Sequence, residues 1–188
     1  MDALMAGFVA ALLTQASDRA PWLSARLADQ FATRRAVIIA VALAVAASNA
    51  IGAAGGALVA PLMTPNARAL LLGLAMLSAG MTALWPAKPL PQPGGRSLGV
   101  FATAVMSLLA MSMGDRTQLL TAAITARSNL PAFAAIGATI GTLAVHIPAI
   151  VAGEQAARRL PTRAVSVAIA ALFILAGAIA LLSALRLI

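Results

Sequence analysis

The sequence contains no cysteine, one histidine and only five acidic residues among 188. The absence of cysteine excludes disulfides and thiolate metal sites. Charged residues make up 10% of the chain and hydrophobic residues 62%, whereas soluble domains average about 25% charged and about 45–50% apolar residues. No phosphate-binding GxxxxGK(S/T) loop occurs, so nothing indicates ATP-driven transport. Because the chain is so rich in apolar residues and so poor in charged ones, we expect an integral membrane protein. We do not expect an enzyme.

Long apolar runs occupy most of the chain. Ala, Leu and Gly dominate these runs and strict alternation is absent, which favours helices over the strands of a membrane barrel. A helix needs about 20 apolar residues to cross a bilayer. We predict an all-α fold with six spans, at 3–30, 36–58, 67–85, 97–126, 131–152 and 163–186. The first and fourth are long, and each carries charge at its middle.

Basic residues are divided unevenly between the two sides of these predicted spans. One side carries Arg26, Arg34, Arg35, Lys88, Arg96, Arg158, Arg159 and Arg163. The other side carries Arg68, Arg127 and Arg186. The positive-inside rule makes the first side cytoplasmic, so both termini should lie on the non-cytoplasmic side. We expect the membrane to be a bacterial inner membrane. Because the charges lie at span ends and not in one patch, we expect lipid contact and no nucleic-acid partner.

The two halves of the chain match at an offset of 97 residues. Asp18-Arg19 falls on Asp115-Arg116, and Asn49 falls on His146. A linker rich in Pro and Gly, 88–96, separates a first half, 1–87, from a second half, 97–188. Each half holds three predicted spans, and an odd number means that the second repeat is inverted. Inverted repeats are typical of secondary transporters, whose site lies near the midplane between the repeats.

Each half places an acid next to a base within a span, in QASDRA (15–20) and SMGDRT (112–117). Charge at the bilayer centre costs at least about 2.5–3.5 kcal/mol per residue. Adjacent helix residues point about 100° apart, so an acid and its neighbour do not face one another. We therefore expect the charges to pair between the halves, or the helix to break at Gly114, with Pro21 breaking the first motif.

The functional interpretation is that Asp18 and Asp115 line a path for a cation or proton, with Arg19 and Arg116 as charge partners. Neutral groups of the same turns complete this predicted site: Gln15, Ser112, Thr117 and Gln118. The alternative is a buried ion pair that only locks the first span to the fourth. Asn49 and His146 would either line the site and relay protons, or simply bond to the backbone.

The stretch SMGDRTQLLTAAITAR (112–127) resembles the signature E-x-G-D-(K/R)-(S/T) of a family of six-span transporters. That family includes the Golgi manganese/calcium transporters of eukaryotes and bacterial manganese exporters. The stretch GATIGTLAVHIPAIVAGEQAARRLP (137–161) is also similar to the family's fifth span and following loop. The resemblance implies two inverted three-span repeats that exchange Mn²⁺ or Ca²⁺ for protons, with the cation at Asp18 and Asp115 and Thr117 beside it. It implies no tightly bound cofactor.

The chain departs from this signature where the family has glutamates, because Gln15 and Ser112 stand at those positions. Two Asp and two Arg give the motifs no net charge, where the family pattern gives −2. Since hard divalent ions prefer carboxylate oxygens, we expect weaker divalent binding or another substrate. Two other functions remain open at this point: a scaffold protein that has lost transport, and an exporter of another solute such as an amino acid. The oligomeric state is not predicted.

Overall fold

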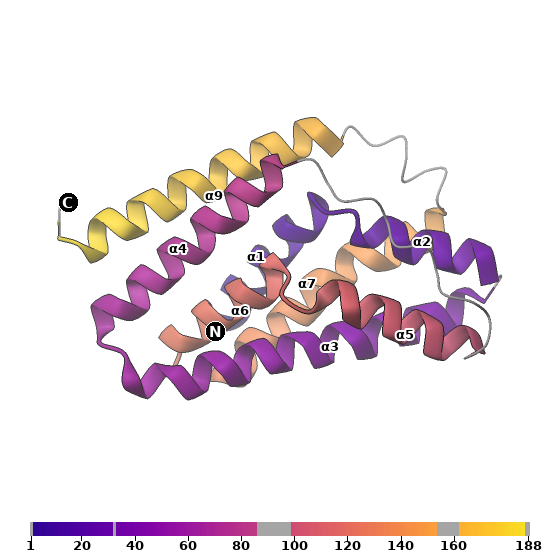
Figure 1. The fold of residues 1–188 in the computed structure, drawn as a ribbon, viewed down its shortest axis with the longest axis horizontal. Helices are drawn as coiled ribbons and strands as arrows, with labels where there is room; N and C mark the ends of the chain where they lie inside the picture. Colours follow the sequence, from indigo (N-terminus) through magenta and orange to yellow (C-terminus); the bar gives the residue numbers. More distant parts are fainter. Residues whose placement is uncertain (1, 32, 86–98, 154–161, 187–188) are drawn as a thin grey trace.

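The computed structural model describes residues 2–31, 33–85, 99–153 and 162–186, and the elements in these ranges are helical (Figure 1). The first half contains α1 (Asp2–Ala16), α2 (Ala20–Phe31), α3 (Arg34–Val59), the 3₁₀ turn η1 (Ala60–Leu62) and α4 (Pro65–Leu84). The second half contains α5 (Gly99–Ser112), α6 (Arg116–Arg127), α7 (Pro131–Ala152) and α9 (Thr162–Ala184). The predicted linker 88–96, with Lys88 and Arg96, and the loop residues Arg158 and Arg159 lie outside the described residues.

The all-α prediction is confirmed for the described residues, and four helical segments are long and apolar enough to cross a membrane. These are Arg34–Leu62, Pro65–Leu84, Pro131–Ala152 and Arg163–Ala184. They coincide with the second, third, fifth and sixth predicted spans. The first and fourth predicted spans, 3–30 and 97–126, each consist instead of two shorter helices in succession. Both contain a break at the Asp-Arg motif.

Each break has a local cause in the sequence. In the first, α1 ends at Ala16 and α2 begins just before Pro21, which has no N–H to bond the carbonyl four residues back, that of Ser17. In the second, Gly114 adopts a φ of 75°, a left-handed conformation that glycine adopts without steric cost. Asp115 then acts as the N-cap of α6, and its side chain accepts a hydrogen bond of 2.6 Å from the Arg116 backbone N–H. The predicted breaks at Gly114 and beside Pro21 are both present.

The helices of the two halves correspond in order. An offset of 97 residues carries the first residues of α1, α3 and α4 onto those of α5, α7 and α9. Proline occupies the first turn of α4 and of α7, where its fixed φ suits a helix start. The repeat seen in the motifs therefore extends to the positions at which the helices begin.

Glycines let several helices approach closely and reveal their relative direction. Gly137 and Gly141 of α7 lie against the backbones of Leu4 and Phe8, so α1 and α7 run parallel. Gly52 and Gly56 of α3 lie in the same way against the backbones of Gln118 and Ala122, so α3 and α6 also run parallel. A Cβ at any of these glycines would collide with the neighbouring backbone, which makes them interface residues.

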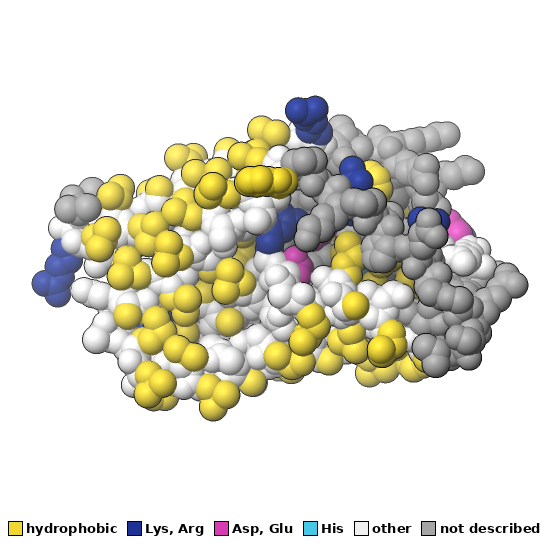
Figure 2. Space-filling model, in the orientation of Figure 1, with side chains coloured by type: hydrophobic (Ala, Val, Ile, Leu, Met, Phe, Trp, Pro, Cys, Tyr) yellow, Lys and Arg dark blue, Asp and Glu magenta, His cyan; other side chains and the backbone are white. Residues whose placement is uncertain are grey.

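The pair α4 and α9 forms one flank of the molecule (Figure 1). Gly73 lies against Leu181, and Gly80 lies against Ile174, so these two helices are antiparallel. A buried apolar cluster joins them to α6, and a second cluster joins α2, α3, α5 and α7. Many large apolar side chains on the outside are exposed, as Figure 2 shows, which fits a surface in contact with lipid acyl chains.

Candidate polar site between the two halves

The two helix breaks meet inside the molecule through an ion pair. Arg116, at the start of α6, places Nη2 3.2 Å from Oδ2 of Asp18, and its Nη1 donates to Ser17 Oγ at 3.5 Å. The two charged side chains are only 15% and 20% exposed. This contact confirms the expectation that the motifs pair between the halves. In Figure 2, basic and acidic side chains are visible together midway along the molecule, beside the α4–α9 flank.

Gln15 connects the first half to the other motif acid. Its Nε2 donates to Asp115 Oδ2 at 3.2 Å and to Thr117 Oγ1 at 2.9 Å. The Thr117 hydroxyl also lies 2.9 Å from that of Thr14. Thr14, Gln15 and Thr117 are all buried. Gln15, Asp115 and Thr117 were predicted to share a site, and the structure brings them into direct contact.

His146 continues this network on the other side of Gln15. Its Nε2 lies 3.1 Å from Gln15 Oε1, and its Nδ1 lies 2.8 Å from Ser24 Oγ. The histidine is 2% exposed and Ser24 is completely buried. His146 therefore bonds side chains of the site, and the alternative of a bond to the backbone does not apply to the contacts seen here.

Asn49, the repeat mate of His146, occupies an equivalent position. Thr121 Oγ1 donates to Asn49 Oδ1 at 3.4 Å, and Asn49 Nδ2 donates to Thr139 Oγ1 at 3.3 Å. Ser24 and Thr121 are themselves 97 residues apart, so the contacts Ser24–His146 and Thr121–Asn49, which both join the two halves, correspond to one another under the repeat. Sequence reasoning missed both hydroxyl residues, although each follows its motif aspartate by six positions.

Gln118 and Ser112 support the second break. Gln118 Oε1 accepts from the Gly114 backbone N–H at 2.7 Å, and its Nε2 donates to the Ser48 carbonyl at 3.2 Å. The Ser112 carbonyl accepts from Ser48 Oγ at 3.0 Å. These bonds replace the backbone partners that a continuous helix would have supplied. Gln118 therefore holds the loop of the second motif through its side-chain amide, and Ser112 does so through its backbone carbonyl.

Arg19 behaves differently from its repeat mate Arg116. It is exposed, and its guanidinium lies 5.8 Å from the ring centre of Trp22, a cation–π arrangement. Asp115 accepts from neutral donors, the Gln15 amide and the Arg116 backbone N–H. The motifs sum to zero charge in the sequence, but their charges are arranged unevenly in space. Asp18 forms the ion pair with Arg116, whereas the hydrogen bonds to the Asp115 carboxylate come from neutral donors, although the charges of Asp18 and Arg116 also act on it.

The donor set suits a hard cation held by oxygens. Within the described ranges, no three His, Cys, Asp or Glu side chains gather closely enough to hold a metal ion. A divalent ion at Asp115 would therefore also need neutral oxygens such as those of Thr117, Thr14 and Gln15, which Ca²⁺ and Mn²⁺ accept. In the observed arrangement Gln15 turns its N–H groups, and not its oxygen, toward Asp115.

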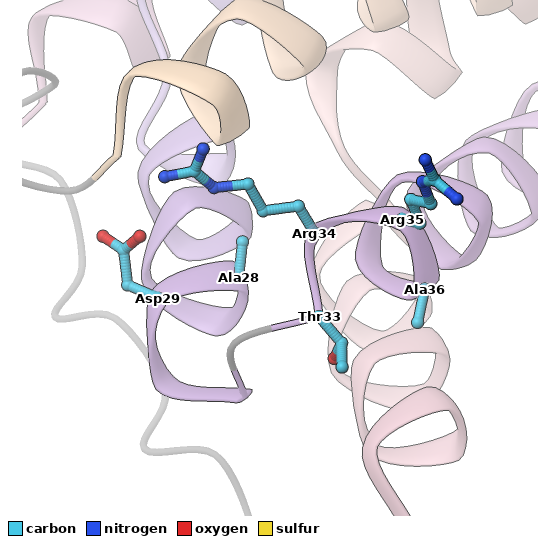
Figure 3. Close-up of a pocket in the computed structure, with 6 residues that line it drawn as sticks. All are labelled: Ala28, Asp29, Thr33, Arg34, Arg35 and Ala36. Carbon is cyan, nitrogen blue, oxygen red and sulfur yellow. The ribbon is translucent and has the colours of Figure 1, made fainter.

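A separate hollow lies at the end of the molecule where α2 turns into α3 (Figure 3). It has a volume of about 710 Å³ and is lined by Ala28, Asp29, Thr33, Arg34, Arg35 and Ala36. Arg34 and Arg35 extend to opposite sides in Figure 3. None of these residues belongs to the polar network around Gln15, so the hollow is not part of the predicted site.

Comparison with known proteins agrees with the resemblance stated from the motifs. Residues 100–187 match the family described as divalent cation/proton antiporter GDT1. The chain is also 25% identical over 176 residues to a protein of Vibrio cholerae serotype O1 named "Putative manganese exporter", covering 93% of this chain and 88% of the relative. No solved structure matches the chain. The resemblance to this transporter family is thus confirmed, and with the apolar helices it makes the chain a membrane protein.

Proposed function

We propose that this relative of the divalent cation/proton antiporters is a secondary transporter that exchanges Mn²⁺ or Ca²⁺ for protons. The observation that carries the proposal is the polar site itself. The contacts Asp18–Arg116 and Gln15–Asp115 join the two halves at the two helix breaks, within an otherwise apolar chain. Broken helices that meet between repeats are the usual place for an ion in transporters of this kind.

The packing supports two inverted repeats with six crossings. Helices α1 and α2 have 15 and 12 residues, too few to cross a bilayer separately, but sufficient in succession. The same holds for α5 and α6, with 14 and 12 residues. The first repeat starts along α1 and returns along α3, and the parallel pairs α1–α7 and α3–α6 place the second repeat in the opposite sense. Exchange of contacts between such repeats would open the site to each side in turn.

The geometry favours a cation over a zwitterionic solute. An amino acid would need one acid and one base of the site available to bind its amino and carboxylate groups. Arg116 is instead engaged with Asp18 at 3.2 Å, and Arg19 lies over Trp22. Asp115 has neutral partners, and an entering cation could replace their hydrogen bonds. Protonation of the same carboxylate would release the cation and so couple the two fluxes.

Flux measurements on reconstituted protein test this proposal. Proteoliposomes loaded with an indicator of Mn²⁺ or Ca²⁺ should show cation movement when a pH gradient is imposed. Asp115→Asn should abolish this movement, because a neutral amide neither attracts the divalent ion nor exchanges a proton at neutral pH. Asp18→Asn should reduce it strongly, since Arg116 then becomes a positive charge without its carboxylate partner beside the site.

Asp2→Asn is the matched control, because Asp2 is an exposed carboxylate in the first turn of α1, outside the polar network. It should leave the flux unchanged. Absence of Mn²⁺ and Ca²⁺ movement in the wild type would refute the exchanger and favour the scaffold function. Flux that survives both motif substitutions would show that the cation passes elsewhere.

A further inference from the structure

The orientation of the Gln15 amide follows from its neighbours. Gln15 Nε2 lies 3.2 Å from Asp115 Oδ2 and donates to it, which is the orientation that a carboxylate able only to accept hydrogen bonds requires. Gln15 Oε1 therefore faces His146, and because a carbonyl oxygen only accepts, Nε2 of His146 must carry the hydrogen of this 3.1 Å contact. Nδ1 of the neutral ring then accepts from the Ser24 hydroxyl at 2.8 Å.

This orientation is unfavourable for a cation at Asp115. The amide N–H groups present the positive end of their dipole to the place where a cation would bind, and the oxygen that could be a ligand lies on the opposite side. Rotation of the Gln15 amide by about half a turn would exchange the two ends. The oxygen would then join Asp115 and Thr117 as a ligand, and the nitrogen would face His146.

The surroundings of His146 can also accept one N–H of the rotated amide. Nε2 would then have to accept from the Gln15 nitrogen, which a neutral imidazole does when its hydrogen is on Nδ1. That hydrogen would be donated to Ser24 Oγ, whose own hydrogen can turn to the Ala20 carbonyl, already 3.2 Å away. The ring stays neutral, because one proton leaves Nε2 to water and one arrives at Nδ1 from water.

Thr117 and Thr14 are compatible with both arrangements. Thr14 Oγ1 can donate to the Ala10 carbonyl at 2.9 Å, so it can accept from the Thr117 hydroxyl in either case. The remaining lone pair of Thr117 Oγ1 accepts from the Gln15 nitrogen in the observed arrangement and would be available to a cation in the other. The Thr14 and Thr117 hydroxyls thus keep their partners before and after the rotation.

We propose that Ser24, His146 and Gln15 form an amide switch, in which His146 positions Gln15 with its nitrogen toward Asp115 when the site is empty and with its oxygen toward Asp115 when a cation is bound. The inference rests on the proposed cation transport. It assigns His146 and Ser24 as positioning residues and makes the glutamine that replaces the family's glutamate a conditional ligand.

The single histidine of the chain allows a direct test. In full-length protein labelled with ¹⁵N in the imidazole, nuclear magnetic resonance distinguishes hydrogen on Nε2 from hydrogen on Nδ1. Without divalent cations the signal should be that of the Nε2–H form. Saturating Ca²⁺, which is diamagnetic, should convert it to the Nδ1–H form. The Nδ1–H form in cation-free protein, or an unchanged Nε2–H form when calorimetry shows Ca²⁺ bound to the same sample, would overturn the switch without affecting the transport proposal.

Affinity measurements provide a second, independent test. Ser24→Ala should lower Mn²⁺ affinity roughly tenfold, because the rotated arrangement would leave the Nδ1–H donor buried without an acceptor. In a Gln15→Glu background the same substitution should change affinity less than twofold, since a carboxylate presents oxygen on both sides. Ser78→Ala is the matched control, because Ser78 donates only to the Ala75 carbonyl within α4. Equal losses in both backgrounds would mean that Ser24 is merely structural.

The two tests separate the failure of the switch from the failure of transport. If wild-type proteoliposomes move neither Mn²⁺ nor Ca²⁺, the transport proposal fails, and the cation-bound form of the switch fails with it. If flux is present but His146 keeps one tautomer, only the switch fails.

Discussion

Single side chains show how this apolar chain accommodates its few charges. Arg116 and Asp18 are both largely buried, and each satisfies the other across the boundary between the halves. Arg19 reaches the surface and lies over Trp22 instead. The two motif arginines, although equivalent in the repeat, therefore make different side-chain contacts. This asymmetry leaves Asp115 as the motif acid that accepts from neutral donors.

The buried ion pair makes a prediction about stability. Arg116→Met should destabilise the protein by about 3 kcal/mol, because it leaves the Asp18 carboxylate buried without its partner. The double variant Asp18→Leu/Arg116→Met should recover most of that loss, since no uncompensated charge remains. Unfolding in detergent micelles measures both. Arg127→Met, at the exposed end of α6, is the control and should have little effect. Additive losses in the double variant would contradict the pairing.

At the level of helices, the two breaks are what give the site its shape. A continuous helix would place Asp115 and Arg116 on different faces and would satisfy its own backbone. The break at Gly114 instead makes Asp115 an N-cap and directs Gln118 back to the Gly114 N–H. In the first half, Pro21 has the corresponding effect, and the Ser17 carbonyl that it leaves without a partner accepts from Ser166 of α9 at 3.3 Å.

The left-handed conformation at Gly114 can be tested separately from packing. A Cβ added at Gly114 would meet nothing within 4 Å, so Gly114→Ala should cost about 1–2 kcal/mol through backbone strain alone. Gly55 is the matched control, because it also has open space around it but lies within α3. Gly55→Ala should be neutral or stabilising by up to about 1 kcal/mol. If both variants have the same stability in detergent, the break does not depend on glycine.

For the whole molecule, the described helix ends agree with the uneven distribution of basic residues. The α2–α3 turn and the end of α7 lie toward one end of the molecule in Figure 1, and α9 begins between that end and the middle. The α3–α4 turn, the α6–α7 turn and the end of α9 lie at the other. Arg34 and Arg35 therefore belong to one end, with Arg163 in the half of the molecule nearer to it, and Arg68, Arg127 and Arg186 belong to the opposite end.

The predicted orientation can be measured without background labelling, because the chain has no cysteine. Thr33→Cys should react with a membrane-impermeant maleimide only from the cytoplasmic side. Asn66→Cys and Asn129→Cys should react only from the opposite side, since Asn66 is exposed in the first turn of α4 and Asn129 is exposed between α6 and α7. Right-side-out and inverted vesicles distinguish the two cases. Reversed labelling would show that the termini face the cytoplasm and that the positive-inside argument fails here.

Much of this architecture follows from the sequence, because helices are local. Apolar runs of sufficient length, prolines at helix starts and a glycine beside Asp115 predict the long helices and both breaks from residues close together in the chain. The offset of 97 residues similarly predicts which helices and which charged residues correspond. For these features, neighbouring residues contain the necessary information.

The contacts within the polar site could not be predicted in the same way. Gln15 and Asp115 are 100 residues apart, and Ser24 and His146 are 122 apart, so their contact depends on how whole helices rotate and approach one another. The close glycine-mediated packing of α1 on α7 and of α3 on α6 sets those rotations. That packing selects Arg116 and not Arg19 for the ion pair, and it turns the Gln15 nitrogen toward Asp115.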